Sequence, residues 1–277
     1  MKIKHLFLII LLAIGFPVFA ENNVFNFSIP TESIIAGSGV ALYGTYFFCD
    51  KILKMDKSLP AEGTIFSKDA VNPFDRIFMN PYNKKIDTLS TFVGAGVVAS
   101  AGILAFTPMN QWITIGSMYA ETLLWAYSLK CIGKLAVGKT RPYMYFDNIP
   151  EEAYSEFDWN DSFPSAHSTF VFAAATFTSY VYCKYFPEST WRYAVIGGTY
   201  SVAALTAAMR ILSGNHFLTD VLAGALIGSV CGFVIPFVHT LPFGKPLNLS
   251  LGKLGTASVN FIPMGVSEFG ILFNVGI

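Results

Sequence analysis

The sequence predicts an all-α protein, a membrane-embedded bundle of five or six helices followed by a short tail with strand-like alternation. Two observations carry this prediction. Hydrophobic residues make up 53% of the 277 residues and charged residues only 13%, which is more apolar matter than one soluble domain buries. Apolar runs also recur along the chain, and five of them approach or exceed the roughly 20 residues that a helix needs to cross a bilayer.

The six apolar runs set the expected organisation. The run 33–49 is the weakest, because it is short and holds three glycines, so it either spans or lies at the interface against the bundle. Short connections after Phe106 and Tyr185 predict antiparallel neighbours. The expected helices are 33–49, 88–107, 111–132, 165–183, 193–212 and 217–238. The expected parts are a signal peptide at 1–20, an N-terminal segment with a weak apolar helix and a polar excursion at 21–87, a helical bundle at 88–238 and a C-terminal tail at 239–277.

The N-terminus has the pattern of a secretory signal peptide. Lys2 and Lys4 precede an apolar stretch, and Val18-Phe19-Ala20 stands before a polar run. We expect cleavage after Ala20, with an uncleaved anchor as the alternative.

Charge and cysteine usage exclude several classes of protein. The formal net charge is zero, so the chain lacks the basic footprint of a nucleic-acid-binding protein. The cysteines are widely spaced and show no paired ligand spacing, so they are expected to be buried thiols and not disulfides or zinc ligands. They are Cys49, Cys131, Cys183 and Cys231.

Gly224, Gly228 and Gly232 recur every four residues in the last apolar run. They form one small-residue stripe, which lets a partner helix approach closely. We expect the stripe to serve packing alone.

Polar groups stand at the ends of three predicted helices. Lys134 and Arg141 are seven residues apart, so they point the same way if the helix persists between them, and two cations that face one spot suit an anion. Pro164 and Ser165 indicate a helix start, whose free amides at Ala166 and His167 can bind phosphate oxygens.

The third group surrounds a helix break at Gly214-Asn215. His216 opens the next helix, and Asp220 follows four residues later, on the same face, where its carboxylate can orient the imidazole. A histidine activated in this way is a potential nucleophile or base. Arg210, just before the break, can hold phosphate with two hydrogen bonds.

Together the three stretches resemble the signature of the type 2 phosphatidic-acid phosphatase superfamily. The family has a lysine, six residues and Arg-Pro, then Pro-Ser-Gly-His, then Ser-Arg, five residues, His, three residues and Asp. All of these spacings fit, and the resemblance covers about 88–238. Ala166 replaces the glycine, and Met209 replaces the serine before Arg210, which removes one hydroxyl donor worth ~1.5–3 kcal/mol toward a charged group.

The resemblance implies a role for each site residue. His216 attacks phosphorus and forms a phosphohistidine, Asp220 holds its ring, and His167 protonates the leaving oxygen. Four further residues hold the phosphoryl oxygens in the transition state, together with the backbone at Ala166. They are Lys134, Arg141, Ser165 and Arg210. Because cations of the protein stabilise the charge, no metal and no other cofactor is expected.

Glu121 is an acid in the middle of an apolar run, where ionisable groups are costly and often functional. A helical wheel places it away from Lys134, so we expect an interhelical hydrogen bond rather than a catalytic role.

These expectations lead to a function and a location. The resemblance implies an integral-membrane phosphatase that acts on lipid phosphate or diphosphate monoesters. The alternatives are an acid phosphatase for soluble monoesters, a lipid phosphotransferase and an inactive anion-binding membrane protein. The expected partners are a lipid phosphate and the bilayer, with no nucleic acid. If only five helices span, the site faces the exterior of a bacterial-type cytoplasmic membrane, and if 33–49 also spans after signal cleavage the site faces the cytoplasm.

Overall fold

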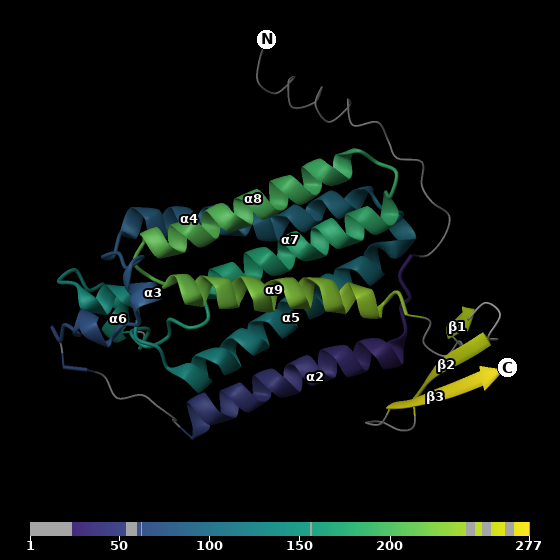
Figure 1. Ribbon diagram of the computed structural model, residues 1–277, viewed down its shortest axis with the longest axis horizontal. Coiled ribbons are helices and arrows are strands. Elements are labelled where there is room, and N and C mark those ends of the chain that lie inside the picture. Colours follow the sequence, from purple (N-terminus) through teal and green to yellow (C-terminus); the bar gives the residue numbers. More distant parts are fainter. Residues whose placement is uncertain are drawn as a thin grey trace, which may run out of the picture.

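The computed structural model describes residues 24–53, 60–61, 63–155, 157–241, 247–250, 256–263 and 269–276. The expected signal peptide at 1–20 lies outside the described residues. Long helices form in all six of the predicted apolar runs and lie alongside one another as a bundle (Figure 1). They are α2 (Ile29–Phe47), α4 (Lys84–Ala99, continued by a 3-10 helix at Ser100–Phe106), α5 (Trp112–Val137), α7 (Ala166–Tyr185), α8 (Trp191–Leu212) and α9 (Leu218–Val238).

Short elements connect these helices. A π-helical segment, Phe48–Ile52, extends α2. The others are 3-10 turns at Lys68–Ala70, Met109–Gln111 and Pro142–Tyr145 and the single-turn helices α3 (Pro73–Arg76) and α6 (Glu152–Ser155). Figure 1 shows α3 and α6 at the same end of the bundle.

Among the described residues, three helices are long and apolar enough to cross a membrane: Lys84–Phe106, Trp191–Leu212 and Leu218–Val238. The helix α7 is less apolar because it lies inside the bundle and packs against α4, α5, α8 and α9. Its polar side chains find partners there, for example Thr176, whose hydroxyl lies 2.7 Å from that of Tyr200. Polar residues of this kind join neighbouring helices inside a membrane bundle.

The helix α9 separates small and large residues on its two sides. Gly224, Gly228 and Gly232 face α7, where a Cβ on each glycine would collide with the backbone carbonyl of Ser165, Thr169 or Ala173 respectively. The opposite side exposes large apolar residues, as a lipid-facing surface does. They are Leu222, Leu226, Val230, Phe233 and Phe237. The expected packing role of the glycine stripe is confirmed.

The helix α2 packs along α5. The indole Nε1 of Trp125 donates to the carbonyl of Ile35 at 2.9 Å, and the hydroxyl of Ser128 donates to that of Gly39 at 3.1 Å. In Figure 1 α2 runs along most of the length of α5. The weakest of the predicted helices is therefore part of the bundle.

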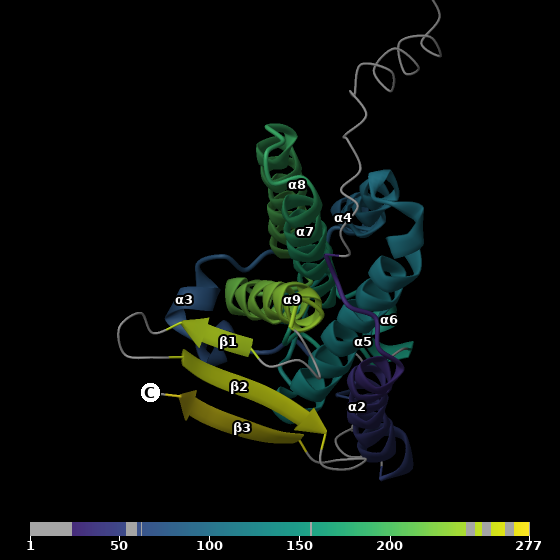
Figure 2. The ribbon, with the colours of Figure 1, turned by 90° about the vertical axis from the view of Figure 1, so that its right-hand side faces the viewer.

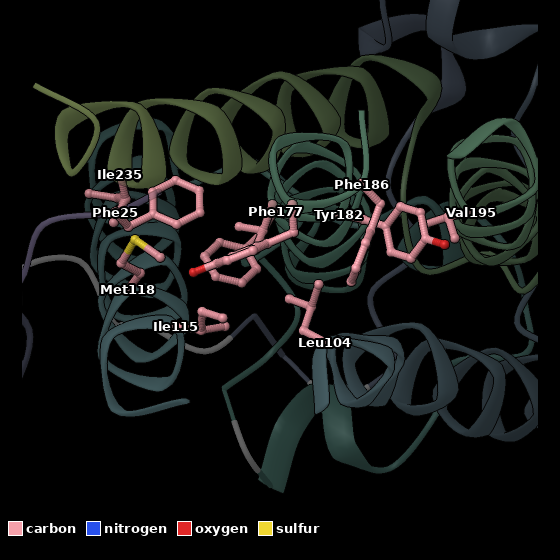
Figure 3. Close-up of a cluster of buried hydrophobic side chains, with 11 residues drawn as sticks. Phe25, Leu104, Ile115, Met118, Phe177, Tyr182, Phe186, Val195 and Ile235 are labelled. Carbon is pink, nitrogen blue, oxygen red and sulfur yellow. The ribbon is translucent and has the colours of Figure 1, made fainter. Parts of the chain in front are cut away.

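The core at the end of the bundle away from α3 and α6 is formed by side chains of several helices (Figure 3). Phe177 of α7 is fully buried in the same cluster as Leu104, Ile115, Met118 and Ile235, the last of which lies near the end of α9. Phe25, which precedes α2, packs in the same cluster. The cluster anchors the start of the described chain to the end of α9.

The tail forms three antiparallel strands in the order β1-β2-β3. They are β1 (Leu247–Ser250), β2 (Thr256–Pro263) and β3 (Phe269–Gly276), with Val259 opposite both Leu247 and Phe273. Figure 2 shows the strands side by side outside the bundle. The tail thus has strands where the alternation of its sequence predicted them.

Candidate active site

A cavity of about 310 Å³ opens at the end of the bundle that carries α3 and α6. Segments far apart in the chain meet there: the backbone N–H of Tyr143 donates to the carbonyl of Gly214 at 3.1 Å, and that of Asn83 to the carbonyl of Ser213 at 3.1 Å. The lining comprises Tyr82, Asp87, Thr91, Arg141, Tyr143, Pro150, Glu152, Asp158, Ala166, His167, Arg210, Asn215 and His216.

His216 lies in the tight connection between α8 and α9. The connection turns at Gly214, which has φ +74 and lies so close to the backbone of Asn80 and Pro81 that no side chain fits. The Nδ1 atom of His216 lies 2.7 Å from the carbonyl oxygen of Ser162. Because a carbonyl can only accept, Nδ1 carries the proton and Nε2 keeps its lone pair. Nε2 lies 3.4 Å from Nη1 of Arg141.

The electrostatic surroundings keep His216 neutral. The side chain is only 2% exposed, and burial lowers its pKa well below the ordinary value. The positive charges of Arg141, Arg210 and Lys134 lower the pKa further, in that order. A neutral imidazole surrounded by cations is suited to attack the phosphorus of an anion.

Asp220 acts on His216 through Ser162. The nearest carboxylate oxygen of Asp220 lies 3.9 Å from Nδ1 of His216, beyond hydrogen-bond range. That oxygen instead accepts from the hydroxyl of Ser162 at 2.5 Å and from the backbone N–H of Phe217 at 2.8 Å. The direct contact expected from the four-residue spacing is thus replaced by a bridge, in which Ser162 binds Asp220 through its side chain and His216 through its carbonyl.

Lys139 and Asp75 complete this arrangement, and sequence reasoning missed both. The ammonium of Lys139 donates to Asp220 at 2.6 Å, to Asp75 at 2.8 Å and to the hydroxyl of Thr219 at 2.8 Å. Burial alone would raise the pKa of Asp75, but hydrogen bonds from Lys139, Thr219 and Asn72 hold it below the ordinary value. The polar excursion before α4 is therefore fixed to the start of α9.

The two arginines of the cavity are held from different sides. Arg141 donates through Nε and Nη2 to the backbone carbonyl and the carboxylate of Asp158, at 2.8 and 2.6 Å. Nη1 of Arg210 binds the carboxylate of Asp87 and, at 2.8 Å, the hydroxyl of Ser90.

Two buried donors in the cavity wall remain without a hydrogen-bond partner among the described residues, Nε of Arg210 and the hydroxyl of Tyr143. Unsatisfied donors in a polar cavity suit a ligand that supplies several acceptor oxygens.

In the motif at the start of α7, some residues line the cavity and another caps the helix behind it. Ala166 and His167 line the cavity, and Nε2 of His167 lies 3.2 Å from the hydroxyl of Thr91. Ser165 is fully buried as the N-cap of α7, and its Oγ accepts from the backbone N–H of Ser168 at 3.4 Å. Ser165 therefore shapes the helix start, while the first amides of the helix have no partner within it.

Lys134 and Arg141 do not lie on one continuous helix. The helix α5 ends at Val137, and Gly138 adopts the left-handed conformation with φ 54, so the helix does not persist to Arg141. Lys134 forms an ion pair with Asp161 at 3.6 Å and lies outside the cavity lining. Its charge still acts on His216, as described above.

Glu121 lies away from this cavity. Its carboxylate approaches His239, which follows α9 at the other end of the bundle.

The chain was compared with known proteins. The sequence model of the PAP2 superfamily matches residues 116–241. The lipid A 1-phosphatase of Porphyromonas gingivalis is 36% identical over 86 residues, which cover 31% of this chain and 18% of that protein. The alignment thus spans less than a fifth of that relative.

Two solved structures were also found. The crystal structure of Aquifex aeolicus LpxE shares 21% identity with a TM-score of 0.37 and covers 58% of this chain and 91% of that one. The crystal structure of a transmembrane PAP2 type phosphatidylglycerolphosphate phosphatase from Bacillus subtilis shares 19% identity with a TM-score of 0.43 and covers 77% of this chain and 98% of that one. The residues 116–241, which match the PAP2 superfamily, contain every predicted site residue from Lys134 to Asp220.

Proposed function

We propose that the chain is an integral-membrane phosphatase that hydrolyses lipid phosphate or diphosphate monoesters through a phosphohistidine at His216. One observation carries the proposal: the unprotonated Nε2 of His216 lies in a cavity beside Arg141, with Arg210 in the same wall. A nucleophile surrounded by fixed cations matches the charge that develops on a transferred phosphoryl group.

In this mechanism Nε2 of His216 attacks phosphorus as the bond to the leaving oxygen breaks. Arg141 and Arg210 bind the phosphoryl oxygens, the free donors at Arg210 Nε and Tyr143 provide further contacts, and Lys134 contributes positive charge from outside the lining. His167 protonates the leaving oxygen and then activates the water that releases phosphate. Ser165 positions the amides at Ala166 and His167. Asp220 positions His216 through Ser162.

The lipid character of the substrate is supported by a second cavity. An apolar groove of about 590 Å³ runs between α4, α5 and α7 and shares Thr91, Ala166 and His167 with the polar cavity. Its other lining residues are apolar: Gly94, Ala95, Val98, Ala99, Leu123, Phe170 and Val171. A hydrocarbon chain in this groove would place its phosphate beside His167 and His216.

The decisive experiment measures phosphate release by the purified protein from isoprenyl diphosphate, phosphatidylglycerophosphate, phosphatidate, lipid A phosphate and a soluble monoester, all in a chelator. We expect turnover of at least one lipid and inhibition by vanadate, which mimics pentacoordinate phosphorus. Activity that is lost in chelator and restored by magnesium contradicts the mechanism. Transfer of the phosphoryl group to an added alcohol identifies a phosphotransferase.

A variant pair separates lipid from soluble substrates. Ala95→Phe fills the apolar groove, and Ala204→Phe, on the exposed side of α8, is the control. We expect Ala95→Phe to reduce turnover of the lipid but not of p-nitrophenyl phosphate. Equal turnover of the lipid by both variants shows that no chain occupies the groove, and loss of both substrates in Ala95→Phe alone shows a folding defect.

We propose the bacterial cytoplasmic membrane as the location, with the site on the outer face. Lys184 and Arg192 flank the short connection at the end away from the site, which favours that end as cytoplasmic. If α2 also spans, its two ends lie on opposite faces of the membrane. A site on the outer face then requires the residues before α2 to lie on the inner face. Cleavage of the expected signal peptide after Ala20 would instead leave those residues outside and place the site on the inner face.

A further inference from the structure

A second cluster of ionisable side chains lies at the end of the bundle opposite the candidate active site. Glu32 comes from the first turn of α2, Glu121 from α5, and His239 is the residue that caps the end of α9. His239 is fully buried, Glu121 is 5% exposed, and the Glu32 side chain is 13% exposed. The length of α9 separates the cluster from His216 by about 30 Å.

The hydrogen bonds of His239 leave the lone pair of its Nε2 atom facing two carboxylate oxygens. Nδ1 of His239 lies 2.9 Å from the carbonyl oxygen of Ile235, so Nδ1 carries the proton of the neutral ring. Nε2 then holds a lone pair, yet its neighbours are Oε1 of Glu32 at 2.9 Å and Oε2 of Glu121 at 3.6 Å. Three acceptor atoms at these distances repel one another unless a cation or added protons lie between them.

The carboxylates themselves are incompletely bonded. Oε2 of Glu32 and Oε2 of Glu121 are buried and have no hydrogen-bond partner in the part of the chain that the structure describes. Burial of an unpaired carboxylate is strongly unfavourable. Glu121 in particular points its free oxygen at the imidazole of His239.

The distances fit ligands of one metal ion. One ligand atom each from Glu32, Glu121 and His239 lies within 4.8 Å of the other two. Ligands at about 2.0–2.1 Å from a tetrahedral zinc ion are about 3.3 Å apart, between the two distances measured to Nε2 of His239. The bond from Nδ1 to a backbone carbonyl is the usual outer contact of a metal-bound histidine.

We propose that Glu32, Glu121 and His239 form a structural site for a first-row divalent cation, with zinc as the best match. Two carboxylates and a neutral imidazole neutralise the charge of the ion and leave a fourth position for water. The ion would join the start of α2 to α5 and to the end of α9. Two members of the buried core cluster (Figure 3) are close to the ligands along their helices, because Met118 precedes Glu121 by three residues and Ile235 precedes His239 by four.

The position of this site defines its role. It lies outside the lining of the polar cavity, so it serves folding of the bundle and takes no part in phosphoryl transfer. Catalysis is therefore expected to continue when the ion is removed, whereas α2 loosens from the bundle.

The experiment measures zinc bound by the purified full chain after chelator treatment, incubation with zinc and desalting. Glu121→Gln is the informative variant, because its amide can donate to Nε2 of His239 and so preserves the fold without a metal. We expect about one zinc ion per chain in the unmodified protein and a loss of zinc affinity of at least about 100-fold in Glu121→Gln and His239→Gln. Glu188→Gln, an exposed carboxylate at the same end, should bind zinc normally.

Thermal unfolding and a second histidine variant complete the test. Zinc should raise the Tm of the unmodified protein and leave that of Glu121→Gln unchanged, while metal-free Glu121→Gln should unfold at a temperature no lower than the metal-free unmodified chain. The proposal is overturned if the unmodified chain binds no zinc, which would indicate a protonated network. It is also overturned if zinc binding is lost in His216→Ala and retained in Glu121→Gln, which would place the ion in the polar cavity.

Discussion

The carbonyl of Ser162 holds Nδ1 of His216 at 2.7 Å, and the hydroxyl of the same serine binds Asp220 at 2.5 Å. The backbone thus fixes the tautomer of the imidazole, and the carboxylate fixes the backbone. This relationship makes the unprotonated Nε2 of His216 a property of the fold.

The two cavity histidines should respond differently to the leaving group. His216→Ala should abolish turnover of every substrate, because no covalent intermediate can form. His167→Ala should cost roughly 10²–10⁴-fold on a lipid phosphate, whose alkoxide needs protonation, and much less on p-nitrophenyl phosphate. Initial rates at fixed pH and detergent measure both. Equal impairment of His167→Ala on the two substrates would contradict its role as general acid.

Stability should fall in acid because of His216. Its pKa in the folded protein is well below the ordinary value of 6.5, so the unfolded chain binds more protons at this residue as the pH falls below 6.5. The free energy of unfolding should therefore decrease from that pH downward until the folded-state pKa is reached. Denaturant unfolding of the unmodified protein and of His216→Gln at several pH values measures this effect. The variant should show a shallower decrease, and an identical slope in both would refute the assignment.

Lys139 should be important for stability as well as for activity. Lys139→Met leaves the fully buried carboxylates of Asp75 and Asp220 without their cation, and breaking a buried pair costs about 3–5 kcal/mol. Chemical unfolding should show this loss. Lys85→Met, at an exposed position in the first turn of α4, is the control and should change stability little. An unchanged free energy of unfolding in Lys139→Met would contradict the charged pairing of Lys139 with Asp75 and Asp220.

The contact between α7 and α9 should tolerate no side chain at Gly228. A Cβ there would meet the carbonyl of Thr169 and the backbone nitrogen of Ala173, so Gly228→Ala should separate the helices and lower both Tm and activity. Gly197→Ala in α8 is the matched control, because a Cβ at that position has open space around it. Comparable Tm values for the two variants would show that α7 and α9 are less closely packed.

Orientation can be measured by labelling single cysteines in an otherwise cysteine-free chain. In the proposed orientation a cysteine at Glu152, beside the site, should react in intact cells with a membrane-impermeant thiol reagent, and one at Glu188 should not. Both positions are exposed, so permeabilised cells should label both and serve as the control. The reverse pattern would place the site in the cytoplasm.

Much of the fold could be predicted from the sequence because apolar runs and helix breaks are local signals. The six helices lie where the runs predicted them, although α2 begins at Ile29, four residues before the expected start at 33. The helix α5 ends at Val137, where Gly138 adopts the left-handed conformation. The seven-residue spacing of Lys134 and Arg141 therefore does not place them on one helix face.

The site was predictable only in part, because only some of its residues belong to local signals such as helix ends. Arg141, Ala166, His167, Arg210 and His216 line the cavity, and each stands at a recognisable helix end. The contact of Lys139 with Asp75 joins residues 64 positions apart, and that with Asp220 joins residues 81 apart. Such contacts arise from tertiary packing and leave no periodic pattern in the sequence.

Gly214 has a consequence for exchanging parts between related enzymes. The connection that presents His216 rests on the backbone of Asn80 and Pro81, and Asp75 and Asp87 reach Lys139 and Arg210 from the same N-terminal side. All four of these residues precede the family-matched region 116–241. A chimaera that transplants 116–241 alone would carry His216 and both arginines but not the segment against which they are set, so we expect the smallest unit that can be transplanted to begin before Asp75.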